Sequence, residues 1–240
     1  MENKELLTIK HDLRFGPEDF DAKGNFKASS LMYAFQEIAA DHANGLGLGF
    51  DDLMANNLIW VLSKVRFQVS GVIEEGKDYV LRTYPRPKKG VTFFRDYYLF
   101  EGEESEGKEP IAKGTSHWCI INFETRKIER AKVDFDGIFV DYEAFENGIE
   151  KFKIDQDTLV QFGVHKVVED DLDDNEHVNN CRYADMVEEE LSGFEECSIY
   201  YSKEALLGDE ILLYKGQEGD YSMIEGRLAD ETVIFQVKTK

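Results

Sequence analysis

The chain has 240 residues, a formal net charge of −21 and a charged fraction of 32%. Nucleic-acid binders need a positive field against the phosphates, so this charge excludes that class. Seventeen Phe and eleven Tyr argue against disorder, because disordered chains are poor in aromatic residues. The longest apolar run, 58–62, is too short to span a membrane. The length fits one large domain or two small ones.

The N-terminal segment and the cysteines indicate the compartment. MENKELLTIKHD has neither an apolar signal core nor the Arg- and Ser-rich character of a transit peptide. Cys119, Cys181 and Cys197 are too few and too widely spaced for a disulfide framework or a zinc site. We therefore expect a reducing, cytoplasmic location. No residue cluster calls for a metal or an organic cofactor.

The first half of the chain is expected to contain a strand, a helix and four further strands. The first strand is predicted at 5–14 and the helix at about 29–43, which GLGLG at 45–49 ends. One face of this helix carries Leu31, Phe35, Ile38 and His42. The four strands are expected at 57–70, 77–85, 92–101 and 110–123. Residues 131–158 have no clear period and predict a connector, with a short helix around 141–147.

The order of elements then repeats in the second half. A strand is expected at 162–169, a helix at 179–192, and strands at 196–206, 210–216, 220–228 and 232–239. The segment VRFQVSGVIEEGKDYVL in the first half also resembles SIYYSKEALLGDEILL in the second. These patterns indicate a duplicated α+β unit in which each antiparallel sheet wraps round a helix. The two half-sheets would then pair into one continuous sheet.

The densest chemistry lies in EDDLDDNEHVNN, residues 169–180. Asp173, Asn175 and His177 stand at i, i+2 and i+4, so in an extended segment their side chains share one face. The predicted helix start would add free N–H groups that suit an oxyanion. The same residue types also suit helix capping, and their spacing leaves both interpretations open. A calcium loop would need a Gly and a terminal Glu that are absent here.

Several segments resemble those of one enzyme family. LDDNEHVNNCRYADMV closely resembles the LDxNxHVNNxxY signature of acyl-acyl carrier protein thioesterases of the plant plastid type and their bacterial relatives. NLIWVLSKVRFQV, TFFRDYYLF and GTSHWCIINFETRKIERA resemble three other family segments in the same order. The resemblance implies a double hot-dog fold. We expect an N-terminal hot dog over 1–140, a connector over 141–158 and a catalytic C-terminal hot dog over 159–240.

The resemblance also implies the catalytic residues, which are Asp173, Asn175, His177 and Glu204. The family's Arg-Arg-Glu-Cys segment corresponds to SKEA at 202–205, so Ala205 stands in place of the cysteine. A cysteine nucleophile at this position is therefore impossible. Two mechanisms stay open. Glu204 could be the general base for an attacking water, or Asp173 could be a nucleophile that forms a mixed anhydride.

The family uses its N-terminal hot dog to hold the acyl chain, and the candidate wall residues here are Phe35 and Trp60. The segment 79–95 is the only sustained basic run, and it contains no acid. It is a candidate docking patch for an acidic acyl carrier protein and its phosphopantetheine, or else a solvated hairpin. The cations proposed to dock the carrier are Arg82, Arg86, Lys88 and Lys89.

We therefore expect a thioester hydrolase that releases fatty acid from fatty acyl-acyl carrier protein and so terminates fatty acid synthesis. A monomer and a homodimer are both compatible with fused hot dogs. An acyl-coenzyme A thioesterase and a non-catalytic acyl-binding hot dog are the alternatives. A dehydratase hot dog fits the motif less well.

Overall fold

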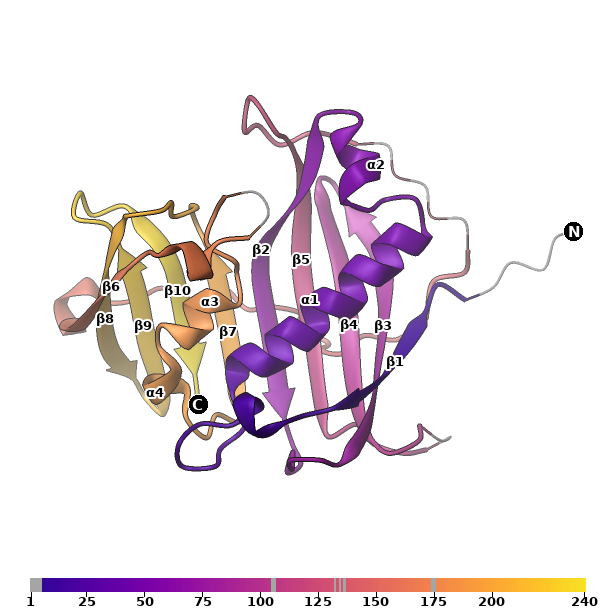
Figure 1. The fold of residues 1–240 in the computed structure, drawn as a ribbon, viewed down its shortest axis with the longest axis horizontal. Coiled ribbons are helices and arrows are strands. Elements are labelled where there is room, and N and C mark those ends of the chain that lie inside the picture. The colour runs from indigo at the N-terminus through magenta and orange to yellow at the C-terminus, as the bar shows by residue number, and fades with distance from the viewer. Residues whose placement is uncertain (1–5, 105–106, 132, 134, 136, 174–175) are drawn as a thin grey trace, which may run out of the picture.

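The computed structural model describes residues 6–104, 107–131, 133, 135, 137–173 and 176–240. Its ten strands form one antiparallel sheet in the order β1-β3-β4-β5-β2-β7-β10-β9-β8-β6. The first half contributes β1 (Ile9–Arg14), β2 (Leu58–Val69), β3 (Asp78–Lys89), β4 (Thr92–Glu101) and β5 (Ala112–Asn122). The second contributes β6 (Val160–Lys166), β7 (Glu196–Tyr201), β8 (Glu210–Glu218), β9 (Tyr221–Arg227) and β10 (Val233–Thr239). The predicted continuous sheet is confirmed (Figure 1).

The two halves of this sheet mirror each other around the central pair of β2 and β7. From the centre outward the first half runs β2, β5, β4, β3, β1, and the second runs β7, β10, β9, β8, β6. The turns before β3 and β8 are also alike, since Gly76 and Gly208 both have positive φ angles, 73° and 87°. Their N–H groups donate to the carbonyls of Phe15 and Val167, at 2.9 and 3.0 Å. These matching turns are the structural form of the repeat in the sequence.

The helices cover one face of the sheet (Figure 1). They are α1 (Ala28–Gly45), α2 (Phe50–Met54), α3 (Arg182–Asp185) and α4 (Glu188–Leu191), and single 3-10 turns occur at Pro17–Asp19, Gln156–Thr158 and Glu169–Asp171. The predicted inward face of α1 is confirmed, because Leu31, Phe35, Ile38 and His42 are all buried. In the described part of the chain, no helix is long and apolar enough to cross a bilayer.

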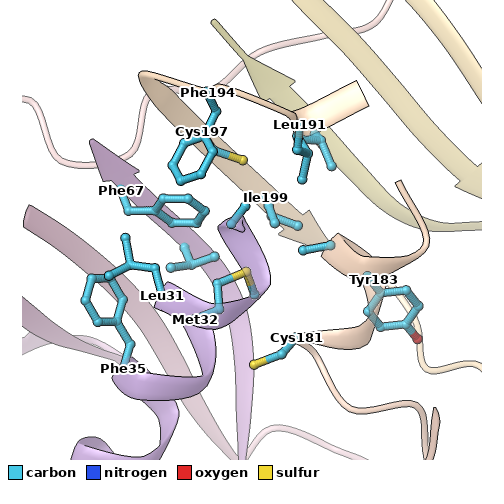
Figure 2. Close-up of a cluster of buried hydrophobic side chains, with 14 of the residues drawn as sticks. Leu31, Met32, Phe35, Phe67, Cys181, Tyr183, Leu191, Phe194, Cys197 and Ile199 are labelled. Carbon is cyan, nitrogen blue, oxygen red and sulfur yellow. The ribbon is translucent and has the colours of Figure 1, made fainter. Parts of the chain in front are cut away.

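The second helix differs from the prediction of one helix over 179–192. It consists of the short pieces α3 and α4, because Val187 between them has non-helical angles, φ −124° and ψ 24°. Val187 is buried in the same apolar core as α1. Figure 2 shows this core, where Leu31 and Phe35 of α1 lie close to Phe67 of β2. One core therefore serves both halves.

Residues 142–158, the strap, cross the sheet face that the helices leave open. Four side chains of the sheet hold the strap, those of Asp96, Arg66, Tyr200 and Glu225. Each stands next to a residue that faces the core, so it points to the opposite face of the sheet. The Ala144 N–H donates to Asp96 at 3.0 Å, and Arg66 donates to the Gly148 carbonyl at 2.8 Å. Tyr200 donates to the Glu150 carbonyl at 2.5 Å. The predicted helix around 141–147 is wrong, since the strap's backbone bonds across to the sheet.

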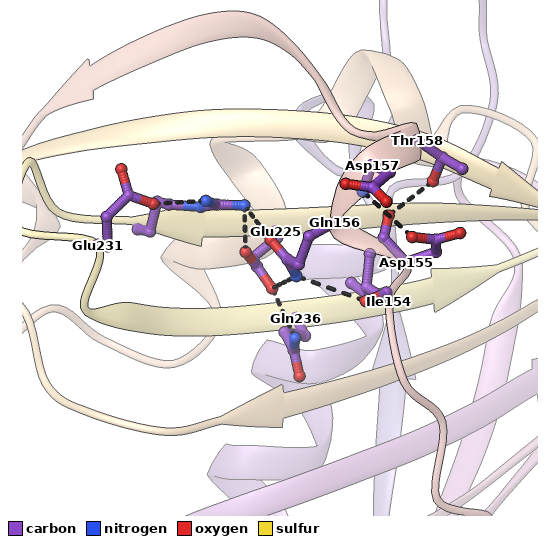
Figure 3. A network of polar contacts seen from close by, with 9 residues as sticks. Ile154, Asp155, Gln156, Asp157, Thr158, Glu225, Glu231 and Gln236 are labelled. Atoms are coloured by element: carbon purple, nitrogen blue, oxygen red, sulfur yellow. Dashed lines mark hydrogen bonds and ion pairs between the residues drawn. The ribbon is translucent and has the colours of Figure 1, made fainter.

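The far end of the strap contacts a buried carboxylate, that of Glu225 on β9 (Figure 3). Arg227 forms an ion pair with Glu225 at 2.6 Å, and the Gln236 amide donates to it at 2.6 Å. The strap's Gln156 amide donates to the same carboxylate at 3.3 Å. The strap therefore joins this part of the sheet through a polar network. The boundaries expected at 140 and 158 stay a prediction.

Candidate functional site

The motif loop is closed by hydrogen bonds between Asp173 and His177. The Asp173 N–H donates to the His177 carbonyl at 2.8 Å, and the Asp173 carboxylate accepts from the His177 N–H at 3.3 Å. Leu172 and Val178 form an isolated bridge on either side. The Asp173 carboxylate thus accepts a backbone N–H, as a residue that caps a turn does. Asn175 lies outside the described residues.

Glu204 comes to this loop from the segment that follows β7. The predicted strand at 196–206 ends at Tyr201, and the chain then leaves the sheet toward the motif loop. The Ala205 carbonyl accepts from the Val178 N–H at 3.1 Å, while the Ala205 N–H donates to the Tyr183 hydroxyl at 3.2 Å. Ala205 itself is fully buried. Its backbone thus fixes the neighbouring Glu204 beside the loop.

His177 and Glu204 are in direct contact at the resulting site. The His177 Nε2 lies 3.3 Å from Oε2 of Glu204. Arg126, from the turn after β5, forms an ion pair with the same Oε2. The structure therefore brings together three of the four predicted catalytic residues, Asp173, His177 and Glu204, and adds Arg126. The sequence analysis missed Arg126, although it lies within the segment GTSHWCIINFETRKIERA.

Most backbone N–H groups near the start of α3 are already engaged. Those of Val178, Asn179, Cys181 and Arg182 donate to acceptors within the protein. Among the residues that the structure describes, the Asn180 N–H has no acceptor, and Asn180 lines the adjoining cavity. The number of donors that could face an oxyanion is thus smaller than a free helix end would offer.

An apolar cavity of about 280 Å³ adjoins the site and extends into the first half. Asp173, Asn180 and Gln36 line it near the motif loop, and Ala43 lines it two turns further along α1. Its remaining walls include the aromatic rings of Trp60, Phe93, Phe94, Trp118 and Phe135. A carboxylate and an amide at one end of an apolar space suit a thioester with an acyl chain.

The two predicted wall residues lie in different places. Trp60 lines the cavity, where its indole N–H donates to the Leu48 carbonyl at 2.9 Å. Phe35 is not among the described lining residues, because it stacks on Tyr97 within the core, with 4.2 Å between ring centroids. Sequence periodicity identified Phe35 as inward-facing but could not separate the core from the cavity wall.

A buried cation also lines this cavity. Arg95 is 8% exposed, and its Nη1 contacts Nδ1 of His42 at 3.1 Å and the Thr83 hydroxyl at 3.3 Å. Burial lowers the pKa of Arg95. Burial, together with the Arg95 charge, lowers the pKa of His42 from 6.5 to about 4. His42 is therefore neutral at pH 7, when its ring nitrogen can accept from the guanidinium.

This shift predicts an acid sensitivity of folding. The unfolded chain takes up a proton at His42 near pH 6.5, whereas the folded protein does so only near pH 4. The free energy of unfolding should therefore fall as the pH drops from 6.5 to 4. In His42→Gln, which cannot take up this proton, urea denaturation should show a smaller decrease over that window. An equal decrease in both proteins would contradict the assignment.

Cys181 lies on the second-half segment nearest α1 but cannot serve as a ready nucleophile. Its side chain is 1% exposed, and burial raises the pKa of its thiol well above the usual range. The thiolate is the reactive form of cysteine, so this environment suppresses it. Its Sγ contacts the Gln36 side chain at 3.6 Å, which indicates a packing role.

The predicted docking cations fall into two pairs. Arg82 forms an ion pair with Glu104, and Arg86 forms ion pairs with Asp96 and Glu143. Lys88 and Lys89 are exposed near the hairpin between β3 and β4, and Lys88 donates to the Ala131 carbonyl at 2.9 Å. The acids that neutralise the two arginines lie outside the basic run. The local charge pattern therefore did not reveal these ion pairs.

Comparisons with known proteins agree with this architecture. The family model described as the acyl-ACP thioesterase N-terminal domain matches residues 6–139. The chain is 24% identical over 199 residues to acyl-acyl-carrier-protein hydrolase FATB1, chloroplastic, of Cuphea viscosissima, covering 77% of this chain and 46% of that protein. It is 22% identical over 202 residues to oleoyl-acyl carrier protein thioesterase 1, chloroplastic, of Arabidopsis thaliana, covering 76% and 55%. The chain thus spans about half the length of these relatives.

Two solved structures share the whole fold. The acyl-ACP thioesterase of Bacteroides thetaiotaomicron superposes with a TM-score of 0.85 at 19% identity, covering 97% of this chain and 96% of that one. The 12:0-ACP thioesterase of Umbellularia californica superposes with a TM-score of 0.81 at 17% identity, covering 98% and 96%. These likenesses confirm the double hot-dog fold. With more than half of its residues matched by the family model, the chain belongs to the acyl-ACP thioesterase family.

Proposed function

We propose that this protein hydrolyses the thioester of fatty acyl-acyl carrier protein, releasing free fatty acid and carrier and so terminating fatty acid synthesis. The observation that carries the proposal is the His177–Glu204 contact of 3.3 Å beside an apolar cavity. Membership of the acyl-ACP thioesterase family supports the same reaction. The retained acid-base pair argues against a purely acyl-binding role.

In the proposed mechanism Glu204 acts as the general base. It takes a proton from a water molecule whose oxygen attacks the thioester carbonyl, and the C–S bond then breaks. The proton passes through Glu204 and His177 to the departing thiolate, which balances the reaction. The turn that holds His177 depends on Asp173, whose carboxylate accepts the His177 N–H. Attack by Asp173 itself, through a mixed anhydride, is the second proposed route.

The proposed partner is an acidic acyl carrier protein. Lys88 and Lys89 are the exposed members of the predicted docking patch, while Phe93 and Phe94, on the same hairpin, line the cavity. A carrier that docked on these lysines would therefore lie close to the cavity. A reducing compartment is the proposed setting, since all three cysteines are free thiols.

The cavity wall predicts an effect on chain length. In Ala43→Phe, the new ring would enter the space beyond Gln36 and shorten it for an acyl chain. We expect kcat/KM to fall at least about tenfold for the longest accepted acyl chain and to change little for the shortest. A ladder of acyl-carrier substrates would measure this. Glu37→Phe is the matched control, because Glu37 is an exposed residue of α1 outside the cavity lining.

The experiment that tests the function compares thiol release from matched acyl-carrier and acyl-coenzyme A thioesters. The proposal expects a higher kcat/KM for the carrier substrates and equal amounts of thiol and fatty acid. A higher kcat/KM for the coenzyme A thioesters would instead show that the substrate is acyl-coenzyme A and not the acyl-carrier protein. Tight acyl binding with no release from any thioester would overturn hydrolysis in favour of a binding protein.

A further inference from the structure

Arg126 approaches Glu204 from the opposite half of the molecule. Its guanidinium forms an ion pair with Oε2 of Glu204, the same oxygen that His177 contacts at 3.3 Å. Glu204 lies on an exposed segment after β7, and its side chain is 37% exposed. A carboxylate on such a segment has rotamer freedom that a single contact does not remove. The Arg126 contact adds a second restraint on the same carboxylate oxygen.

The backbone of Arg126 is strained. Its φ angle of 54° lies in the left-handed region, which is unfavourable for a side chain of this kind. The turn is held by two contacts to Asn122, because the Arg126 N–H donates to its carbonyl at 2.9 Å and the Thr125 N–H to its side chain at 2.8 Å. Glycine would suit this conformation better. The turn therefore fixes the backbone from which the Arg126 side chain reaches Glu204.

We propose that Arg126 is a positioning residue that orients Glu204 toward His177 and the attacking water. This inference rests on the proposed thioester hydrolysis. The N-terminal half then supplies a residue to the acid-base site of the C-terminal half as well as the cavity. An exposed ion pair adds little to folding stability, so the contact matters for geometry rather than for the fold.

Two consequences separate this role from a structural one. Loss of Arg126 should lower kcat about 10- to 100-fold at nearly constant KM, because a misplaced catalytic group costs rate rather than binding. In a Glu204→Gln background the same loss should have no further effect, since both residues act through one carboxylate.

The experiment measures steady-state kinetics with one acyl-carrier thioester for the wild type, Arg126→Gln, Arg126→Lys and Arg126→Gly. Arg126→Lys should recover part of the rate, because it keeps the charge. Arg126→Gly should lose the rate without loss of thermal stability, because it relieves the strained backbone. Lys127→Gln is the matched control, a neighbouring exposed cation for which the structure describes no side-chain contact.

The outcomes are distinct. Unchanged kcat in Arg126→Gln, with an active wild type, would overturn the inference and leave the function standing. A loss confined to KM, or one that persists in the Glu204→Gln background, would also overturn it, because Arg126 would then bind substrate. An equal loss of kcat in Lys127→Gln would show that the effect comes from general surface charge, and this too would overturn the inference. No turnover by the wild type would overturn the proposed function and the inference with it.

Discussion

Glu204→Gln should lower kcat for acyl-carrier thioesters by about 10²–10⁴-fold, because an amide cannot act as the general base. The substitution keeps the size of the side chain and one oxygen for Arg126 and His177, so the loop should keep its shape. Substrate binding uses the cavity, which Glu204 does not line, and KM should change little. Stopped-flow detection of the released thiol would measure the effect.

The matched control for this substitution is Glu218→Gln, an exposed glutamate at the end of β8. It removes the same charge from the same half and should leave kcat unchanged. Turnover of Glu204→Gln within a few-fold of the wild type would exclude Glu204 as the base. The nucleophilic route through Asp173 would then be the better account.

Arg227→Met should destabilise the protein by about 3–5 kcal/mol, because it leaves the buried Glu225 carboxylate without its cation. Glu225 is fully buried, and Arg227 contacts it at 2.6 Å. Met keeps much of the apolar stem of Arg227. It removes the guanidinium, which lies 4.2 Å from the centre of the Tyr214 ring, so the ion pair and this cation–π contact are lost together. Urea denaturation would give the difference in the free energy of unfolding.

A second substitution provides the control. Glu225→Gln in the Arg227→Met background removes the stranded charge while keeping an amide for Gln236 and Gln156. The double variant should therefore be more stable than Arg227→Met alone. A loss below about 1 kcal/mol in Arg227→Met would instead place this pair among surface ion pairs of little energetic consequence.

The fold was predictable because its signals are local. Strand-like stretches of sequence located the strands, and the spacing of Leu31, Phe35, Ile38 and His42 identified α1. The repeated Gly before a charged pair, at Gly76 and Gly208, marked the duplication. The strap was not predictable, because its backbone bonds to sheet side chains that are distant in sequence. The break in the second helix at Val187 was also not predicted from the local sequence.

The site was predictable only as far as its motif extends. LDDNEHVNN placed Asp173 and His177 in one loop, and the resemblance placed Glu204 with them. The turn between Asp173 and His177 depends on a carboxylate that accepts a backbone N–H, which spacing alone did not reveal. Arg126 is 78 residues from Glu204 in the chain, so only the pairing of the two halves brings them together. Glu104 and Glu143 lie outside the basic run, so the local charge pattern did not reveal that they pair with Arg82 and Arg86.

The central claim is that water, with Glu204 as base, attacks the thioester without a covalent intermediate. The most direct measurement is a single turnover of acyl-carrier thioester by excess enzyme in water labelled with heavy oxygen, followed by acid quench and mass spectrometry. The account predicts one labelled oxygen in the fatty acid, an equal amount of free carrier thiol, no acyl-protein and no label in Asp173. Trapped acyl-protein, label in the Asp173 carboxylate, or no thiol release would contradict it.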